Sequence, residues 1–207
     1  MKQNECCIRV SRKTYFNELA ETWDERFYTQ ELAIFLEKLV SNFGLEPGQD
    51  ILDVGTGSGI LIPFLLQAVG SAGSITAIDY AEKMVQVCRS KYSHLKNVTI
   101  ILQDVEKLNF HSDTFDAVTC FGLFPHLENK EQTLSHIHLV LKSGGKLIIA
   151  HALSSTEIKV HHSISSAVVH DALPKKQEMK RFLKRAGFIN IFIEDKPGYY
   201  FCISTKL

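Results

Sequence analysis

A glycine-rich turn flanked by carboxylates is the part of the chain whose residue types and spacing best suit chemistry. Residues 51–60 read ILDVGTGSGI, which places Gly55, Gly57 and Gly59 directly after a short apolar run. Glycines in such a turn let the backbone bend sharply and approach a ligand that any side chain would hold away. Asp79 follows about 20 residues later, where a carboxylate can accept hydrogen bonds from both hydroxyls of a ribose. The combination predicts a ligand that contains adenosine.

Asp53 indicates the charge of that ligand, because it lies inside the apolar run just before the turn. A carboxylate at this position would repel a pyrophosphate and would suit a cation. The turn also reads GxGxG, whereas dinucleotide-binding proteins carry GxGxxG. S-adenosylmethionine has an ammonium group and a sulfonium, so electrostatics favours it over NAD.

A histidine-rich stretch is the second candidate for chemistry. Of the nine histidines, His151, His161, His162 and His170 fall close together, and Asp171 follows. Three interpretations stay open. One histidine acts as an acid, base or hydrogen-bond partner of the substrate; the group binds zinc, iron or a similar ion; or the histidines are solvated loop residues. The spacing is irregular and two of these histidines are adjacent, so they would point apart on a regular element. We therefore expect no metal.

The elements that must position these residues alternate between strand and helix after about residue 45. Predicted strands cover residues 50–55, 74–79, 97–102, 115–121 and 146–152, and predicted helices cover 60–69, 81–92 and 130–141, the last ended by Ser143, Gly144 and Gly145. This alternation implies a parallel sheet with right-handed crossovers. His151 would then stand at the carboxyl end of a strand, where ligands bind in open α/β sheets.

The two ends of the chain complete the predicted fold. The first 44 residues have helical spacing and are expected to cap the open end of the sheet. Residues 153–174 are expected to form a long connection without secondary structure, and such connections are usually lids or binding loops. A helix over 175–186 precedes two strands joined at Lys196-Pro197-Gly198, which predicts an antiparallel hairpin with one reversed edge strand.

Composition limits the classes of protein that fit. At 207 residues with 45% hydrophobic and 22% charged residues, one globular domain is expected. Lys+Arg and Asp+Glu are both 23, so the neutral charge disfavours nucleic acid. No apolar run is long enough for a membrane span, and the N-terminus lacks the apolar core of a signal peptide. The five cysteines are odd in number and lack a CxxC, which predicts reduced thiols and a cytoplasmic location. The adjacent Cys6 and Cys7 could bind a soft metal or metalloid, although a frayed terminus is the simpler interpretation.

With these motifs in place, the sequence resembles the class I S-adenosylmethionine-dependent methyltransferases, and within them the small single-domain type 11 branch that includes quinone-biosynthesis enzymes. The resemblance covers residues 12–206 and rests on LDVGTGSG, IDYAEKM, LQDVEKLNF, FDAVTCFGLFPHL, LKSGGKLIIA and RKTYFNELAETWD. It implies a Rossmann-like three-layer sandwich. Its seven-stranded sheet would be mostly parallel, with an antiparallel last strand and an N-terminal helical cap.

The resemblance also implies a set of donor contacts. Asp53 and the turn around Gly55 would hold the amino acid part of the donor, Asp79 the ribose, and Asp104 the adenine amino group. The full implied set is Asp53, Gly55, Thr56, Gly57, Gly59, Asp79, Tyr80, Met84, Asp104, Val105, Phe121, Tyr15 and Trp23. Met84, Phe121, Tyr15 and Trp23 could equally be ordinary packing residues. The family often has LPF where this chain reads Leu108-Asn109-Phe110.

The resulting expectation is a cytoplasmic methyltransferase acting on a small molecule, with neither nucleic acid nor membrane as partner and with a homodimer left open. His151 is the first candidate to act on the acceptor, followed by His126 and His162. An apolar acceptor pocket is expected from Leu123, Phe124, Leu153, Ile158, Val160, Ile164, Val168 and Val169. A quinone-like or other aromatic acceptor, a thiol and a metalloid all stay open.

The expected organisation is one domain over residues 1–207. It divides into a helical cap (1–44), a donor-binding core (45–152), an acceptor-side lid loop (153–174) and a C-terminal helix and hairpin (175–207). Two rival functions remain. One is a nucleotide-dependent oxidoreductase, and the other is a metal-binding or regulatory protein that keeps the fold without turnover.

Overall fold

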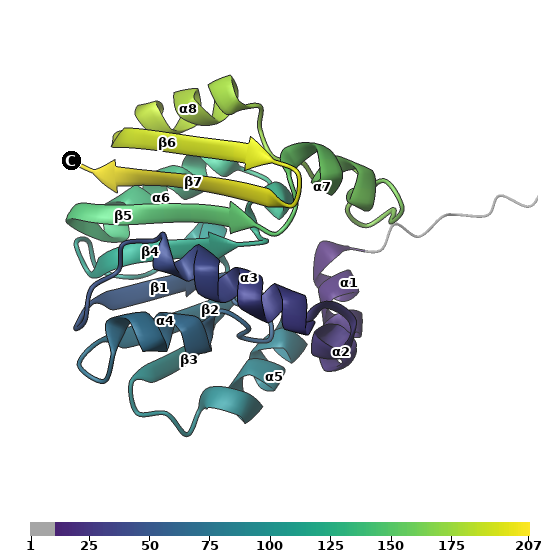
Figure 1. The fold of residues 1–207 in the computed structure, drawn as a ribbon, viewed down its shortest axis with the longest axis horizontal. Coiled ribbons are helices and arrows are strands. Elements are labelled where there is room, and N and C mark those ends of the chain that lie inside the picture. The colour runs from purple at the N-terminus through teal and green to yellow at the C-terminus, as the bar shows by residue number, and fades with distance from the viewer. Residues whose placement is uncertain (1–10) are drawn as a thin grey trace, which may run out of the picture.

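The computed structural model describes residues 11–207, and a seven-stranded sheet lies at its centre (Figure 1). The strand order is β3-β2-β1-β4-β5-β7-β6. The strands are β1 (Asp50–Val54), β2 (Ser74–Asp79), β3 (Val98–Leu102), β4 (Phe115–Phe121), β5 (Leu141–His151), β6 (Phe188–Lys196) and β7 (Tyr199–Lys206). The prediction about Cys6 and Cys7 lies outside the described residues.

The first five strands are parallel, and β7 runs antiparallel to both β5 and β6. The predicted hairpin and the reversed last strand are therefore confirmed. The expectation that the reversed strand forms the edge is wrong, since β6 is the edge and β7 lies inside the sheet. Burial explains this order. Successive residues Tyr200, Phe201 and Cys202 of β7 are all buried, as in a strand covered on both faces, whereas Phe192 of β6 is 54% exposed.

Helices cover both faces of the sheet and make a three-layer sandwich (Figure 1). On one face, α3 (Gln30–Ser41), α4 (Ile62–Val69) and α5 (Glu82–Tyr92) pack on one set of strand residues, including Ile51 and Ile75. On the other, α6 (Lys130–Val140) and α8 (Lys176–Arg185) pack on the alternate set, including Leu52 and Val54. This alternation follows from the period of two along a strand. Within residues 11–207, no helix has the length and apolar character needed to cross a membrane.

The N-terminal helices divide between two positions. Helices α1 (Arg12–Leu19) and α2 (Trp23–Phe27) lie at the carboxyl ends of the parallel strands (Figure 1). Helix α3 instead buries Leu36, Leu39 and Val40 in the core on one face of the sheet. Among residues 11–44, α1 and α2 thus form the expected cap over the sheet end, and α3 is not part of it.

The predicted stop for α6 at Ser143, Gly144 and Gly145 is wrong. The helix ends at Val140, and Leu141 already pairs with Phe115 as the first residue of β5. Leu141 is fully buried, so it is held in the sheet, and the pairing register shifts between Phe115 and Ala117. The two glycines therefore belong to an irregular strand start and not to a helix cap.

The expectation of a connection without secondary structure after β5 is also wrong, because helix α7 (Ser155–His162) occupies its first part. Its start is a capping box, in which the Ser154 hydroxyl accepts a hydrogen bond from the Glu157 N–H and the Glu157 carboxylate accepts one from the Ser154 N–H. Ile158 is buried in the core on the α6–α8 side of the sheet. The S-x-x-E spacing was the signal that could have predicted this helix.

Candidate functional site

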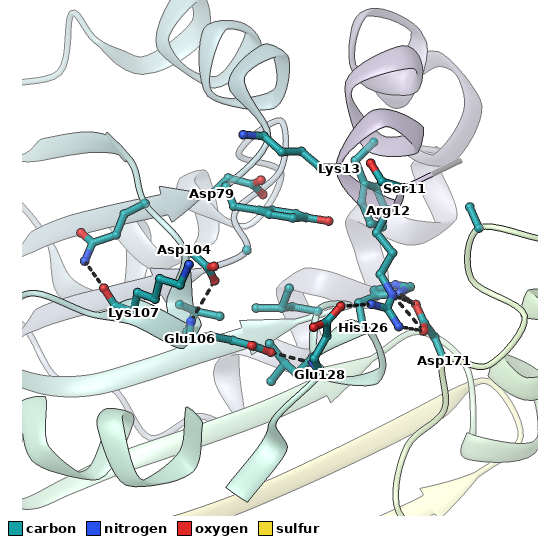
Figure 2. Close-up of a pocket in the computed structure, with 18 of the residues that line it drawn as sticks. Ser11, Arg12, Lys13, Asp79, Asp104, Glu106, Lys107, His126, Glu128 and Asp171 are labelled. Atoms are coloured by element: carbon teal, nitrogen blue, oxygen red, sulfur yellow. Dashed lines mark hydrogen bonds and ion pairs between the residues drawn. The ribbon is translucent and has the colours of Figure 1, made fainter. Parts of the chain in front are cut away.

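A cleft of about 620 Å³ opens at the carboxyl ends of the parallel strands, with α1 along one side (Figure 2). Its lining comes from α1, the glycine turn, the ends of β2 and β3, the segment after β4 and the segment after α7. The lining residues are Ser11, Arg12, Lys13, Phe16, Gly55, Asp79, Tyr80, Gln103, Asp104, Val105, Glu106, Lys107, Leu123, His126, Leu127, Glu128, Ala167, His170 and Asp171. Predicted donor contacts and predicted acceptor contacts therefore meet in one cavity.

The glycine turn approaches this cleft with two different kinds of glycine. Gly57 has φ +57°, and a Cβ added there would meet no atom within 4 Å, so it borders open space. Gly59 has φ +85°, and a Cβ there would come within 2.7 Å of the Tyr92 ring and 2.8 Å of Cys88 Sγ. Gly57 thus leaves room for a ligand beside the backbone, and Gly59 lets α5 pack against the turn.

Asp79 is held rigidly at the floor of the cleft. Its Oδ2 accepts a hydrogen bond from the Gly57 N–H at 2.9 Å, and its Oδ1 accepts one from the Ala81 N–H at 2.8 Å. Burial raises the pKa of this carboxyl, and the backbone N–H donors oppose that rise. Each carboxylate oxygen keeps a further lone pair, so Asp79 can still accept two hydroxyl donors.

Asp53 is buried beside the turn but is not part of the cleft lining. Its Oδ1 accepts a hydrogen bond from the Thr119 hydroxyl at 2.7 Å, while its Oδ2 has no partner within residues 11–207. Burial is the main reason that its pKa rises to about 6, and the hydrogen bond from Thr119 opposes that rise. An unpartnered buried carboxylate oxygen is costly, and an ammonium group is the kind of donor that would relieve that cost.

Asp104 and Val105 lie across the cleft from α1, after β3. The Asp104 carboxylate accepts a hydrogen bond from the Glu106 N–H at 2.9 Å and so fixes the short helical turn Val105–Lys107. Val105 is 7% exposed and contributes an apolar wall. Asp104 and Val105, which are both predicted donor contacts, therefore line the same cavity as Asp79.

His126 and Asp171 form the polar centre of the other side of the cleft. Nδ1 of His126 lies 2.7 Å from Oδ2 of Asp171, and since a carboxylate only accepts, Nδ1 is the protonated ring nitrogen. The backbone carbonyl of Asp171 also accepts a hydrogen bond from Nδ1 of His162 at 2.8 Å. The two imidazole rings lie 4.9 Å apart between centroids. One acidic residue therefore orients two histidines.

Arg12 closes this group from the N-terminal side (Figure 2). Its guanidinium donates to both carboxylate oxygens of Asp171, with contacts of 2.6 to 3.0 Å, and its Nη1 donates to Glu128 at 2.9 Å. Burial raises the pKa of Asp171, but hydrogen bonds from His126 and Arg12 outweigh it and bring that pKa down to about 2. Asp171 is therefore ionised at any working pH.

His151, the first of the predicted histidines, does not line the cleft. Its Nδ1 accepts a hydrogen bond from the Leu153 N–H at 3.0 Å, and its ring stacks on Phe121 with centroids 6.3 Å apart. Burial lowers its pKa to about 3, and the nearby histidines act in the same direction. His151 is accordingly neutral with its proton on Nε2. Its predicted role stays a prediction, and the same is true of the buried His162.

Other predicted donor contacts lie outside the lining. Met84 is buried with Ala20 and Ala81, and Trp23 packs on Phe16 and Phe27. Tyr15 makes an edge contact with Phe16, whose ring centroid is 5.4 Å away. These contacts match the packing alternative, and the donor roles of these residues stay predictions.

The expected apolar acceptor pocket is wrong as a set, since only Leu123 of its eight residues lines the cleft. Phe124, Ile158 and Val168 are buried in the core, and for Ile158 the reason is that α7 turns this side chain toward the sheet. Val160 and Ile164 are exposed at 65% and 84%. The cleft is instead rich in charged and polar side chains.

The candidate metal ligands are not gathered into a site. Within residues 11–207, no three His, Cys, Asp or Glu side chains are arranged to hold a metal ion. His161 and His170 are exposed while His162 is buried, so the adjacent pair points apart as predicted.

Arg12 is the most consequential residue that the sequence analysis missed. It stands immediately after Ser11, whose hydroxyl accepts a hydrogen bond from the Thr14 N–H and so begins α1. That N-cap was visible in the sequence, but nothing there indicated that Arg12 meets Asp171, from which it is separated by 159 positions. Lys13, Glu106 and Glu128 were missed for the same reason.

The fold and the cleft together define a Rossmann-like α/β protein with a cleft at the carboxyl ends of its parallel strands, where such folds bind ligands. Residues 51–145 match the family described as a methyltransferase domain. A demethylmenaquinone methyltransferase of Staphylococcus aureus is 26% identical, over 80% of this chain and 78% of that one. These matches support a class I S-adenosylmethionine-dependent methyltransferase whose methyl donor is S-adenosylmethionine.

Solved structures agree with this fold. A SAM-dependent methyltransferase from Aquifex aeolicus superposes with a TM-score of 0.70 at 24% identity and covers 93% of this chain and 97% of its own. A Thermotoga maritima protein described as a possible histamine N-methyltransferase gives a TM-score of 0.73 at 16% identity, with 93% and 98% covered. At these identities the likeness concerns the fold alone.

Proposed function

We propose that the chain methylates a small molecule bound between α1 and the segment after β4, and that His126 is the base that receives the acceptor's proton. The observation that carries the proposal is the His126–Asp171 pair, which lines the same cleft as Asp79 and the glycine turn. We further propose that residues 1–207 act as one methyltransferase domain.

The residues on the β1–β3 side of the cleft fit the donor. Asp79 has lone pairs left for two hydroxyls, Gly57 borders open space, and Asp53 Oδ2 lacks the partner that an ammonium group would provide. Asp104 and Val105 would hold the adenine, and Tyr80 would lie beside it. When bound, S-adenosylmethionine supplies an electrophilic methyl group on a sulfonium centre.

The residues on the other side fit a base. Because Nδ1 of His126 donates to Asp171, its Nε2 carries the lone pair and can take a proton from a hydroxyl, a thiol or a protonated amine. The carboxylate of Asp171 stabilises the imidazolium that forms and keeps the ring in one tautomer. The rest of the rate acceleration comes from alignment of the acceptor beside the donor and from exclusion of water.

The chemistry of the lining favours a small polar acceptor. Arg12, Glu128 and His170 surround the proposed acceptor position, and few apolar side chains do. The Staphylococcus aureus relative is named for a quinone precursor, which supports an aromatic ring in the acceptor. A small aromatic molecule that carries an ionisable hydroxyl or amine satisfies both observations.

Calorimetric titration tests the donor half first. S-adenosylmethionine and S-adenosylhomocysteine should bind with micromolar affinity and NADH should not. Asp79→Ala should abolish that binding, whereas Glu37→Ala, at an exposed position on α3, should leave it unchanged. Acceptor screening would follow with small phenols and amines of matched size. Binding of NADH in place of the two sulfur compounds would overturn the proposal.

A further inference from the structure

Arg12 occupies a place in the site that the proposed proton transfer does not by itself explain. It is the first residue of α1, and Ser11 fixes the start of that helix. From there its side chain reaches across the cleft to Asp171 and Glu128, which belong to two other segments (Figure 2). Lys13, one residue further along, also borders the cleft, but it pairs with Glu82.

Arg12 binds the Asp171 carboxylate in a bidentate manner, through Nε and Nη2. Nε and Nη2 of Arg12 lie 3.0 and 2.6 Å from Oδ1 of Asp171, and Nε lies 2.8 Å from Oδ2. Oδ2 is also the atom that holds Nδ1 of His126, whereas within residues 11–207 Oδ1 has no side-chain partner besides Arg12. The Asp171 side chain is 2% exposed, so water does not replace a lost donor readily. The planar fork of the guanidinium therefore sets the orientation of the carboxylate.

We propose that Arg12 is a positioning residue for the methyl transfer: it locks the Asp171 carboxylate so that His126 keeps its proton on Nδ1 and presents an unprotonated Nε2. The inference rests on the proposed role of His126 as base. During transfer the acceptor atom forms its bond to the methyl carbon, the bond from that carbon to sulfur breaks with its electrons going to sulfur, and the acceptor's proton passes to Nε2. Arg12 keeps Asp171 ionised throughout, so the proton stays on the imidazole.

The other charged and titratable groups near His126 do not substitute for Arg12. His162 from α7 lies tilted beside the ring and donates to the Asp171 carbonyl, and Glu128 faces Arg12 itself. Lys130 of α6 donates to the backbone carbonyls of Pro125 and Leu127. Other neighbours are Tyr80 after β2, His151 at the end of β5, His161 of α7 and His170 beside Asp171, and none of these four has a hydrogen bond to the Asp171 carboxylate. Among residues 11–207, Arg12 is the one residue that donates to both oxygens of that carboxylate.

Nitrogen-15 NMR of histidine side chains tests this inference without an acceptor. The two ring nitrogens give distinct signals when protonated and when bare, and His126→Gln assigns the signals of His126. At a pH where the ring is neutral, the wild-type protein should show His126 almost wholly protonated on Nδ1. Arg12→Gln should convert this signature into a mixture of both tautomers. Arg26→Gln, which makes the same substitution at an exposed position on α2 outside the cleft lining, should leave it unchanged.

Arg12→Lys separates position from charge, because a lysine restores the cation without the fork. We expect a smaller admixture of the second tautomer than in Arg12→Gln. If Arg12→Gln does not fold, Arg12→Lys decides the question alone. A wild-type His126 signature in every folded Arg12 variant overturns the inference. Titration with S-adenosylhomocysteine is read separately, and failure of the wild type to bind it would overturn the proposed function while the tautomer result still decides the role of Arg12.

Discussion

The carboxylate of Asp24 accepts a 2.5 Å hydrogen bond from the hydroxyl of Ser58, which joins helix α2 to the glycine turn. Lys91 of α5 donates to the second oxygen of Asp24 at 2.6 Å. Ser58 is fully buried and lies between Gly57 and Gly59, so this link holds the glycine turn in place. Since Arg12 ties the start of α1 to Asp171 on the other side, the N-terminal helices connect the two halves of the site.

This link predicts that Asp24→Ala weakens donor binding although Asp24 does not line the cleft. A hydrogen bond to a charged group contributes about 1.5–3 kcal/mol, so the loss of order in the turn should reduce the affinity for S-adenosylhomocysteine by about 10-fold or more. Calorimetric titration measures this. Glu25→Ala removes an exposed carboxylate from the same helix and should have no effect. Equal affinities in the two variants would show that the link is not needed by the turn.

Substitution of Gly57 or Gly59 by alanine should have different effects on donor binding and on stability. Gly57→Ala places its methyl group in the open space proposed for the donor, so donor affinity should fall by more than 10-fold while stability falls by about 1 kcal/mol from the positive φ. Gly59→Ala drives a methyl group into Tyr92 and Cys88, so its main effect should be a loss of stability of a few kcal/mol. Urea denaturation and donor titration of both variants separate the two effects. Similar stability losses in both would contradict this assignment.

The donor side of the site was predictable because its signals are local in the sequence. Gly55 and Asp79 follow short apolar runs, and parallel strands bring the ends of such runs to one edge of a sheet. The same logic led to His151, which does stand at the end of β5. Its Nδ1 is engaged by the Leu153 N–H, however, and its ring stacks on Phe121 outside the cleft. Strand position alone does not determine which way a side chain turns.

The acceptor side was not predictable to the same degree because its contacts are long-range. Arg12 meets Asp171 only once α1 lies over the sheet end and the segment after α7 folds back toward it. The apolar residues of 153–169 looked like a pocket wall, but α7 buries part of them in the core. The spacing of these apolar residues is typical of a helix that faces the sheet, whereas the sequence analysis interprets them as a loop that faces a ligand.

His126→Gln should remove most of the activity once an acceptor is known. General base catalysis contributes roughly 100-fold or more, so kcat should fall by at least about that factor while donor affinity stays unchanged. His161→Gln, at an exposed position on α7, provides a matched control and should retain full activity. His151→Gln is measured in the same series. A large loss of activity in His151→Gln, together with an active His126→Gln, would support the prediction that His151 acts on the acceptor. Initial rates at saturating donor measure all three.

The raised pKa of Asp53 predicts how the stability of the fold depends on pH, because burial raises that pKa from 3.8 to about 6. Above pH 6 the carboxylate is ionised in both the folded and the unfolded chain, and the folded chain carries the cost of a buried charge, about 3 kcal/mol. Below pH 6 the folded protein takes up a proton while the unfolded chain is still ionised, so this cost is relieved as pH falls toward 3.8. The stability of Asp53→Asn relative to wild type should therefore decrease between pH 7.5 and pH 5 when both are unfolded in urea without donor.

Donor affinity should depend on pH with the opposite sign to stability. If Asp53 holds the donor's ammonium group, the ionised carboxylate is the binding form, so wild-type affinity for S-adenosylhomocysteine should fall as pH drops through 6. Asp53→Asn should bind weakly at every pH and show no such slope. Calorimetric titration at pH 7.5 and pH 5 of both proteins measures this, with the slope taken as the difference between them so that other titrating groups cancel. A wild-type affinity that is independent of pH, together with a pH-independent stability difference, would mean that the buried Asp53 carboxylate serves packing of the turn with Thr119 and has no part in holding the donor.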